Sequence, residues 1–257
     1  MILAVLIRNR EITLGCMDGT AVVAEASVVT AERSADEYAL LFRDVLALRN
    51  VCFTNFDGVI LASVVPTLTD TVIAALGRLT DARVRVVGCG TKTGLHIRIE
   101  DPAQLGTDLV CSAVAAAADY PTPLLLIDAG TATAFSVLGG DGAYLGCAIA
   151  PGIALSSAAL SAAASLLPSV ATGAPAKCIG TTTAESMKSG SLYGTAAMLD
   201  GMIARMEREL GVPFATVLAT GDVIRDVLPA CDTAIGYDET LALRGLALIH
   251  ERSTKKK

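Results

Sequence analysis

Residues 124–152 have the sequence LLLIDAGTATAFSVLGGDGAYLGCAIAPG, and this stretch decides the fold. It opens with a short continuous apolar run, which is typical of a buried β-strand. The run ends at Asp128, and Gly130 and Thr131 follow, so a carboxylate precedes a turn whose backbone and hydroxyl can approach a phosphate closely. Two further apolar runs flank Gly139-Gly140-Asp141-Gly142 and predict a β-hairpin. Taken alone, the stretch also fits a buried hairpin with a tight turn and no further role.

The amino terminus is where a second copy of this arrangement is expected, because phosphotransferases of the sugar-kinase and actin superfamily contain it twice. Residues 1–15, MILAVLIRNREITLG, have the same strand-turn-strand outline. The chemistry differs, since Leu6 stands where the second copy has Asp128 and Arg8 stands where it has Gly130. Arginine carries a Cβ and a long side chain where a bare backbone would let a phosphate close in. Half of the expected nucleotide site is therefore degraded.

Composition excludes several classes of function. The chain has 257 residues, 53% of them hydrophobic, and no run of about 18 apolar residues is free of polar interruption, so we expect no membrane span. No secretion signal is recognised at the start, which makes the cytoplasm the expected location. A net charge of −6 argues against a nucleic-acid partner. Seven scattered cysteines and two histidines lack the spacing of a zinc site.

The pattern of elements predicts an α/β fold built from two similar units. Residues 120–123, Tyr-Pro-Thr-Pro, mark the expected boundary, which gives domains 1–119 and 120–257. In each half several strands precede helices, so we expect two mixed sheets with a nucleotide-binding cleft between the domains. Strands are predicted at 2–7, 12–17, 21–29, 58–65, 84–87, in three runs between 124 and 150, and at 214–220; helices at 35–48, 68–79, 108–119, 155–165 and 183–210.

Segments spread over the whole chain resemble one family, the type III pantothenate kinases, which carry out the first step of coenzyme A synthesis. The fold that this resemblance implies is a pair of duplicated ribonuclease H-like domains of the actin and sugar-kinase superfamily. The segments follow one another in the family's order, which a single short motif could not do by chance. They are ASVVP (62–66), GTKTGL (90–95), DP (101–102), GTD (106–108), the Asp128 hairpin, AIAPG (148–152), LLP (166–168), IGTTT (179–183), SG and YG (189–190, 193–194) and ATG (219–221).

The resemblance also implies roles for individual residues and a set of cofactors. It implies in-line phosphoryl transfer from ATP with Mg²⁺ and a monovalent cation, K⁺ or NH₄⁺, where catalysis is mostly positioning and charge neutralisation. Asp108 resembles the general base that takes the proton from the pantothenate hydroxyl. The other implied roles are substrate binding by Gly106, Thr107 and Thr183, ATP binding by Asn9, Gly130 and Thr131, and cation binding by Asp128.

Each of these polar residues also has an interpretation in local structure alone. Asp108 could serve as a helix-start residue, and Asp128 could cap its own turn. Thr183 could be the N-cap of the long helix that follows it.

The departures from the family pattern are as specific as the matches. The family's amino-terminal D-x-G-N-T appears here as Leu6-Ile7-Arg8-Asn9-Arg10, which keeps the asparagine alone. Its G-x-D-R ends here in Leu109, so a cation is missing beside Asp108. Ile99 replaces a substrate-contacting tyrosine, and Asp222 follows Thr220-Gly221 where a second glycine is usual. Losing a carboxylate that positions a metal lowers the rate of phosphoryl transfer by orders of magnitude.

Three hypotheses follow. The first, which we favour, is one subunit of a heteromeric pantothenate kinase that completes its site with a paralogous partner; a dimer with itself is the alternative assembly. The second is a catalytically silent regulatory or binding paralogue. The third is a kinase for another small molecule, with Arg8 and Arg10 as anion contacts or as solvated turn residues.

We also expect residues 183–210 to lie near a subunit contact, since five apolar side chains recur there at helical spacing: Met198, Leu199, Met202, Ile203 and Met206. The alternative is that this stripe packs into its own domain.

Overall fold

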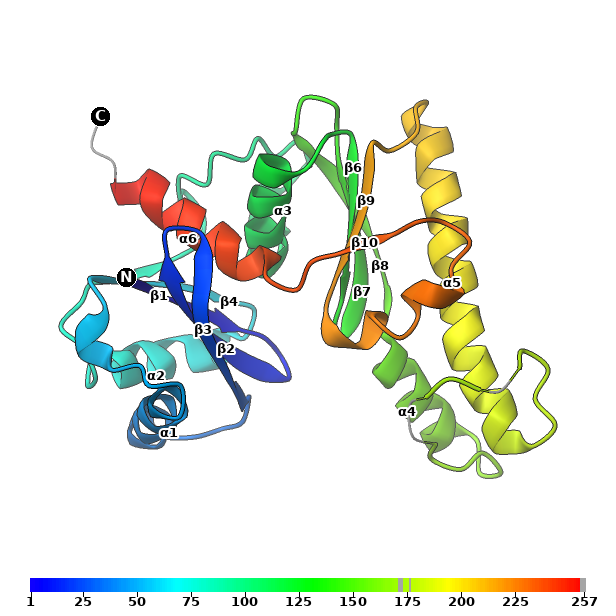
Figure 1. The fold of residues 1–257 in the computed structure, drawn as a ribbon, viewed down its shortest axis with the longest axis horizontal. Helices are drawn as coiled ribbons and strands as arrows, with labels where there is room; N and C mark the ends of the chain where they lie inside the picture. The colour runs from blue at the N-terminus through cyan, green and yellow to red at the C-terminus, as the bar shows by residue number, and fades with distance from the viewer. Residues whose placement is uncertain (171–172, 176, 255–257) are drawn as a thin grey trace. The chain divides into compact units, whose positions relative to one another are not determined.

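The computed structural model describes residues 1–170, 173–175 and 177–254, which fall into two compact units (Figure 1). Unit 1 comprises Met1–Asp119 together with the segment from Thr240 onward, and unit 2 comprises Tyr120–Glu239. The division differs from the predicted halves at the carboxyl end. Helix α6 (Leu241–Thr254) packs against α3 (Thr107–Asp119) and buries its apolar face there, so it belongs to unit 1.

Unit 1 is built on a five-stranded mixed sheet in the order β3-β2-β1-β4-β5. β1 pairs antiparallel with β2 and parallel with β4, and β4 pairs parallel with β5. The strands are β1 (Ile2–Ile7), β2 (Glu11–Asp18), β3 (Ala21–Val29), β4 (Gly58–Ser63) and β5 (Val84–Val86). The three predicted amino-terminal strands are confirmed, with ends moved by no more than one residue.

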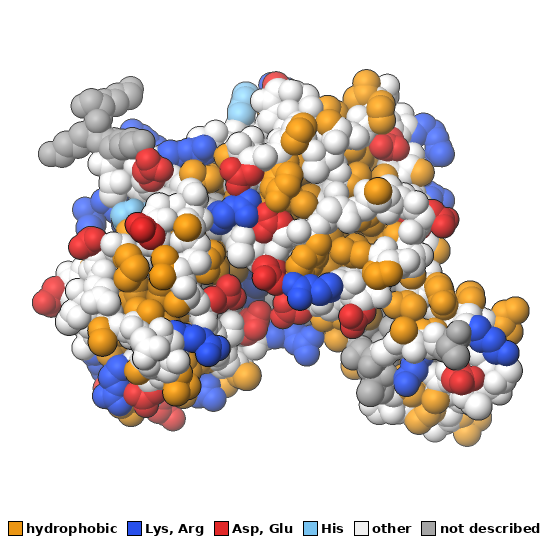
Figure 2. All heavy atoms as spheres, viewed as in Figure 1, with side chains coloured by type: hydrophobic (Ala, Val, Ile, Leu, Met, Phe, Trp, Pro, Cys, Tyr) orange, Lys and Arg blue, Asp and Glu red, His pale blue; other side chains and the backbone are white. Residues whose placement is uncertain are grey.

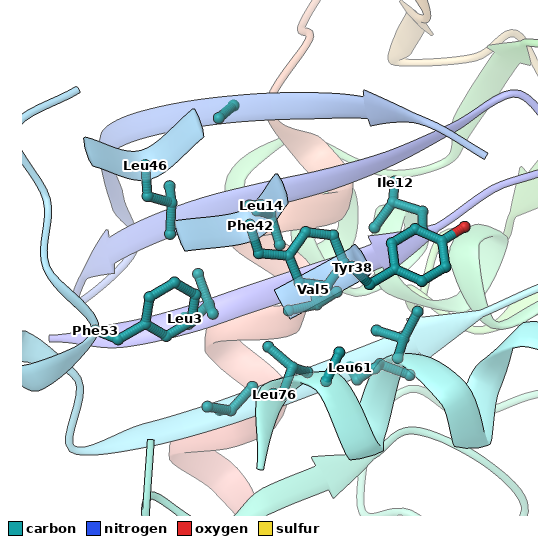
Figure 3. Packing of buried hydrophobic residues seen from close by; sticks show 14 of the residues in the cluster. Leu3, Val5, Ile12, Leu14, Tyr38, Phe42, Leu46, Phe53, Leu61 and Leu76 are labelled. Carbon is teal, nitrogen blue, oxygen red and sulfur yellow. The ribbon is translucent and has the colours of Figure 1, made fainter. Parts of the chain in front are cut away.

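Both faces of the unit 1 sheet are covered, which explains why β1 is one continuous apolar run. Leu3, Val5 and Ile7 face a core closed by α1 (Ala35–Ala47) and α2 (Pro66–Leu76), as Figure 3 shows for Leu3 and Val5. Ala4 and Leu6 face a second core closed by α3 and α6. A capping box starts α1, with Glu37 N donating to Ser34 Oγ at 3.3 Å.

Helices α3 and α6 approach so closely that the contact requires a glycine. A Cβ placed on Gly245 of α6 would lie 1.8 Å from the carbonyl oxygen of Cys111 in α3. No side chain fits at that distance, so the carboxyl-terminal helix packs backbone to backbone on the helix that carries Asp108. The last element of the chain therefore helps to position a candidate site residue.

Unit 2 repeats the topology of unit 1. Its sheet has the order β10-β9-β6-β7-β8, in which β6 pairs antiparallel with β7 and parallel with β9. The strands are β6 (Leu124–Ala129), β7 (Ala132–Leu138), β8 (Tyr144–Pro151), β9 (Thr216–Thr220) and β10 (Gly236–Tyr237), and the helices are α4 (Ile153–Ala163) and α5 (Thr183–Leu210). β6 thus corresponds to β1, and β9 to β4. The predicted fold class, two duplicated ribonuclease H-like units, is confirmed.

The apolar stripe of α5 packs inside unit 2. Leu199 and Ile203 are buried in the core beneath β6, and Met198, Met202 and Met206 pack against that core. The stripe is therefore explained by its own unit, and it gives no support to a subunit contact. The described residues also contain four short 3₁₀ turns: Phe53–Asn55, Pro102–Gln104, Asp222–Ile224 and Leu228–Ala230.

Charged side chains of both signs are interspersed on the face seen in Figure 2. Apolar side chains also reach the surface in α4 and the segment after it, where Leu155, Leu160, Leu166 and Ile179 are between 47% and 90% exposed. Within the described residues, none of the helices has both the length and the apolar character needed to cross a bilayer.

Candidate functional site

Two strand ends meet the start of α3 in unit 1. β1 and β4 are parallel neighbours with Ile7 opposite Ser63, so their carboxyl ends lie at the same edge of the sheet. Thr107, the first residue of α3, donates its hydroxyl hydrogen to the Ser63 carbonyl at 2.9 Å. This bond fixes the start of the helix at the strand end, and it brings the next residue, Asp108, toward the turn between β1 and β2.

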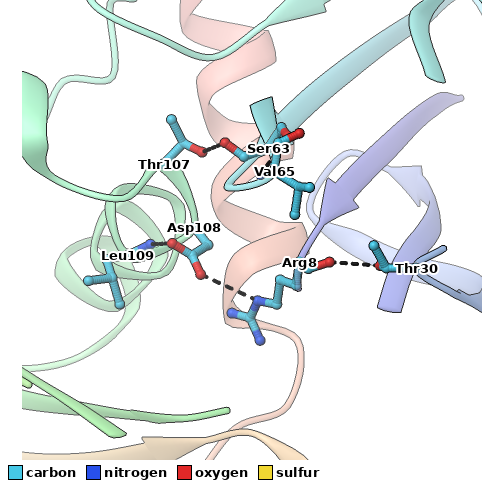
Figure 4. Close-up of polar contacts among 7 residues, drawn as sticks. All are labelled: Arg8, Thr30, Ser63, Val65, Thr107, Asp108 and Leu109. Carbon is cyan, nitrogen blue, oxygen red and sulfur yellow. Dashed lines mark hydrogen bonds and ion pairs between the residues drawn. The ribbon is translucent and has the colours of Figure 1, made fainter. Parts of the chain in front are cut away.

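Asp108 forms an ion pair with Arg8, which is the first residue of that turn (Figure 4). Arg8 Nε lies 3.6 Å from Asp108 Oδ2, while Oδ1 accepts a hydrogen bond from the Leu109 amide at 2.9 Å. The Arg8 backbone is held at both of its polar groups: its amide donates to Glu11 O at 2.9 Å, and its carbonyl accepts from Thr30 Oγ1 at 2.7 Å. The sequence identified both charged residues and did not predict that they pair.

Burial separates Arg8 from the rest of its turn. The Arg8 and Asp108 side chains are 22% and 19% exposed, whereas Asn9 and Arg10 are exposed residues. Arg8 therefore turns inward and is not a solvated turn residue, while Arg10 does lie in the exposed part of the turn.

The same two charges act on a thiol beneath them. Burial raises the pKa of Cys111 far above its usual range, the negative charge of Asp108 raises it further, and Arg8 lowers it. The thiol is neutral at every physiological pH, so Cys111 acts as a small apolar residue of the core.

The corresponding strand end in unit 2 keeps oxygen donors. Asp128 is 5% exposed, and its register partner on β9 is Thr220, which is 4% exposed. Because register partners project to the same face of a sheet, a carboxylate and a hydroxyl lie side by side. Gly130 and Thr131 follow in the turn, where Gly130 N donates to Ala132 O at 2.9 Å and the Thr131 side chain belongs to an exposed residue.

A glycine closes this strand end from the β9 side. Gly221 has φ of 100°, and a Cβ at this position would lie 2.2 Å from the Ala129 carbonyl oxygen. The end of β9 therefore packs directly on the end of β6, which holds the Asp128 turn in place. The Thr220-Gly221 pair was visible in the sequence, but its packing role was not.

Thr183 is not the cap of its helix. The N-cap of α5 is Thr182, whose hydroxyl accepts a hydrogen bond from Glu185 N at 3.2 Å. The capping interpretation of Thr183 is therefore wrong by one residue. Thr183 lies in the first turn with an exposed side chain.

The donor set at Asp128 suits a hard cation, which prefers carboxylate and hydroxyl oxygens. No cluster of three His, Cys, Asp or Glu side chains able to hold a metal occurs among the described residues. Asp128 and Thr220 therefore fit a cation that also takes oxygens from a phosphate ligand, and they do not form an all-protein cage. At the equivalent positions of unit 1, Leu6 and Ala62 offer no oxygen.

Solved structures define the class of protein. A protein from Campylobacter jejuni described as a Baf family transcriptional activator matches with a TM-score of 0.63 at 15% identity, covering 97% of this chain and 98% of that one. The activator of 2-hydroxyisocaproyl-CoA dehydratase from Clostridium difficile, with bound ADPNP, matches with a TM-score of 0.55 at 12% identity, covering 100% and 98%. The chain has the fold of the actin-like and sugar-kinase ATPases.

Sequence comparison defines the family. The family model of the type III pantothenate kinases matches residues 2–205. A type III pantothenate kinase from an Exiguobacterium species is 39% identical over 256 residues, covering 99% of this chain and 100% of the relative. The one from Caulobacter vibrioides is 38% identical over 257 residues, covering 99% and 98%. This chain belongs to the type III pantothenate kinase family.

Proposed function

We propose that this chain takes part in the ATP-dependent phosphorylation of pantothenate as one subunit of a heteromeric kinase. Its partner would be a paralogue that carries an intact D-x-G-N-T turn and G-x-D-R segment. The observation that carries this proposal is the contrast between the two strand ends: Asp128 and Thr220 keep oxygen donors, and Leu6 and Ala62 have none. A chain kept only as a scaffold would have no need of a buried carboxylate in unit 2.

The residues would divide the work as follows. Asp128 would hold a monovalent cation, K⁺ or NH₄⁺, and Gly130, Thr131 and Asn9 would contact ATP bound with Mg²⁺. Asp108 would accept the proton of the pantothenate hydroxyl as its oxygen attacks the γ-phosphorus and ADP leaves. Gly106, Thr107 and Thr183 would contact the substrate.

The surface of α4 supports a subunit contact. Of its eleven residues only Ile153 is buried, while Leu155 and Leu160 are 49% and 47% exposed. Leu166 and Ile179, in the segment that follows, are 90% and 80% exposed. Exposed apolar side chains grouped in this way are typical of a surface that a permanent partner covers, and we assign this surface to the contact with the paralogous subunit.

One observation favours a second candidate, a silent binding paralogue. Arg8 pairs with Asp108, so the carboxylate that would act as base is engaged by a residue of the degraded turn. In that case the chain would stabilise its partner without sharing its chemistry. A kinase acting on another anionic small molecule is the third candidate, because Arg8 supplies a cation.

Co-expression with a paralogue tests the proposal. We expect the purified chain alone to show no turnover with ATP, Mg²⁺, pantothenate and a potassium salt, and the co-purified pair to be active. Within the pair, Thr183→Ala and Asp128→Ala in this chain should lower kcat, and Arg10→Gln, in the exposed part of the turn, should not. Turnover of about 1 per second by the chain alone would refute the heteromer. An active pair that tolerates both alanine variants would instead indicate the silent paralogue.

A further inference from the structure

The chain that leads into α5, residues 178–182, folds back along the first turns of that helix. We call it the entry segment. At its beginning, the buried Ser189 of α5 donates its hydroxyl hydrogen to the Cys178 carbonyl. Near its end, Glu185 Oε2 accepts hydrogen bonds from the Thr181 amide at 3.3 Å and from the Thr181 hydroxyl at 3.1 Å. Two side chains of the helix therefore hold the entry segment against it.

The Glu185 carboxylate makes a contact that capping of the helix does not require. In a capping box, the glutamate at the third helical position bonds the backbone amide of the N-cap residue. The N-cap here is Thr182, whose hydroxyl accepts from Glu185 N at 3.2 Å, but the carboxylate reaches one residue further back, to Thr181. A Cβ on Gly180 would lie 2.5 Å from Ser186 N, so a glycine lets the entry segment come this close to the helix. Glu185 thus fixes the entry segment as well as the helix end.

Thr183 lies where the chain reverses from the entry segment into the helix. Of the three successive threonine hydroxyls, that of Thr181 donates to Glu185 and that of Thr182 caps α5. The Thr183 side chain is exposed, and its hydroxyl makes no hydrogen bond to another described residue. Helix ends fray when nothing holds them. Because the residues on both sides of Thr183 are anchored, its side chain starts from a fixed backbone.

We propose that Glu185 is a positioning residue for Thr183. By holding Thr181 against α5 it fixes the Thr183 backbone, and the Thr183 hydroxyl meets the substrate from that position. A displacement of about 1 Å at a substrate contact can lower a rate by about a hundredfold, so such an anchor matters for catalysis. The link to the substrate rests on the proposed function, in which Thr183 contacts pantothenate. The fixing of the Thr183 backbone does not.

Backbone relaxation of the ¹⁵N-labelled full chain tests the fixing of Thr183 without turnover. We expect the order parameter of the Thr183 amide to be about 0.85 in the unmodified chain and to fall toward about 0.6 in Glu185→Ala. Glu185→Gln keeps an oxygen that can accept from Thr181, so it should restore most of the order. Glu207→Ala is the matched control, because Glu207 holds the segment after α5 by accepting from Phe214 N at 3.0 Å. It should leave the Thr183 amide unchanged.

Steady-state kinetics of the co-purified pair test the link to the substrate. Glu185→Ala should lower kcat/KM for pantothenate about threefold to tenfold, the range expected for one hydrogen bond, and should leave the KM for ATP unchanged. Glu207→Ala should change neither value. Because Glu185 acts through Thr183, Glu185→Ala should cause no further loss once Thr183→Ala is present.

Two results would overturn the proposal. If the Thr183 amide is as rigid in Glu185→Ala as in the unmodified chain, Glu185 does not fix it. If the losses from Glu185→Ala and Thr183→Ala are additive, Glu185 does not act through Thr183. Should Glu185→Ala fail to fold, Thr181→Val removes the hydroxyl half of the same contact and takes its place in both measurements. A pair of subunits without turnover would refute the proposed function, while the order parameters would still decide whether Glu185 fixes Thr183.

Discussion

The ends of β1 and β6 occupy the same place in the two repeats and carry opposite chemistry. Each strand lies at the centre of its sheet, between an antiparallel and a parallel neighbour. The next-to-last residue is Leu6 in one and Asp128 in the other, and these are 4% and 5% exposed. The residue after the strand is Arg8 in one and Gly130 in the other.

The difference shows that the fold does not depend on the site chemistry. The sheets are specified by apolar residues that alternate between two cores, and Leu6 satisfies this pattern at least as well as an aspartate. The strand-end residues are therefore free to diverge while the topology is kept. Burial of the charged Asp128 side chain, by contrast, costs free energy, and an interaction with a partner group or a ligand has to offset that cost.

The comparison of the two strand ends predicts that substitutions there have their largest effect on catalysis. In the proposed pair of subunits, Asp128→Asn should lower kcat about a thousandfold, because it would remove the charge that we propose holds a cation while keeping the shape. Leu6→Met, a volume-conserving change at the equivalent position, should leave kcat within about twofold. Steady-state assays of both variants, with circular dichroism as a check of folding, decide this. Equal effects of the two changes would mean that the strand ends do not differ in function.

Stability should respond next, through the glycine that packs on the β6 end. Gly221→Ala combines a positive φ with a Cβ 2.2 Å from Ala129 O, so we expect a loss of about 3 kcal/mol or more in the free energy of unfolding. Gly142→Ala has φ of 75° with open space around the Cβ, so it isolates the backbone strain and should cost about 1 kcal/mol. Urea unfolding measures both. Similar losses would show that the close approach of β9 to β6 contributes nothing.

Much of this architecture could be predicted from the sequence because it depends on local patterns. Apolar runs separated by short turns predicted β1 to β3, and a serine followed three residues later by a glutamate is the usual sequence of a capping box, which α1 has at its start. The return of α6 to unit 1 could not be predicted, since it depends on Gly245 meeting a backbone carbonyl more than a hundred residues away. Apolar patterning also failed to distinguish a core stripe from an interface stripe on α5, because both bury the same residue types.

The candidate site divides in the same way. Asp128, Gly130 and Thr131 lie within four consecutive residues, so the sequence alone places them close together. The ion pair of Arg8 and Asp108 joins positions a hundred residues apart, and only the parallel register of β1 and β4 with the anchored start of α3 brings them near. An arginine and an aspartate one hundred positions apart give no sequence signal that they are in contact.

That ion pair gives the third prediction. In a double-mutant cycle with Arg8→Gln and Asp108→Asn, we expect a coupling of about 1–2 kcal/mol in the free energy of unfolding, because both side chains are about four-fifths buried. The matched pair Arg78 and Asp36 in the same unit is 46% and 78% exposed and should couple by less than about 0.5 kcal/mol. Added salt should reduce the second coupling more than the first. Equal coupling energies for the two pairs would mean that the ion pair of Arg8 contributes no more than a surface ion pair does. The end of β1 would then differ less from the end of β6 than we infer.

The smallest expected effect is a change of stability with pH, and it concerns α6, which packs in the core of unit 1 and belongs to that unit. Its His250 packs on β4, where a Cβ on Gly58 would lie 2.7 Å from His250 Nε2. Burial lowers the pKa of His250 from its usual 6.5, and the positive charge of Arg85 lowers it further. The unfolded chain therefore binds a proton at a higher pH than the folded chain, so the stabilisation is complete above about pH 6.5 and is lost as the pH falls below that value. Partial exposure limits the loss to well under about 1 kcal/mol. Urea unfolding between pH 7.5 and 5 should show the free energy of unfolding falling with pH, both in the unmodified chain and in the control His96→Gln, whose histidine is exposed. His250→Gln should remove this pH dependence. If the pH dependence survives in His250→Gln, the proton binds elsewhere.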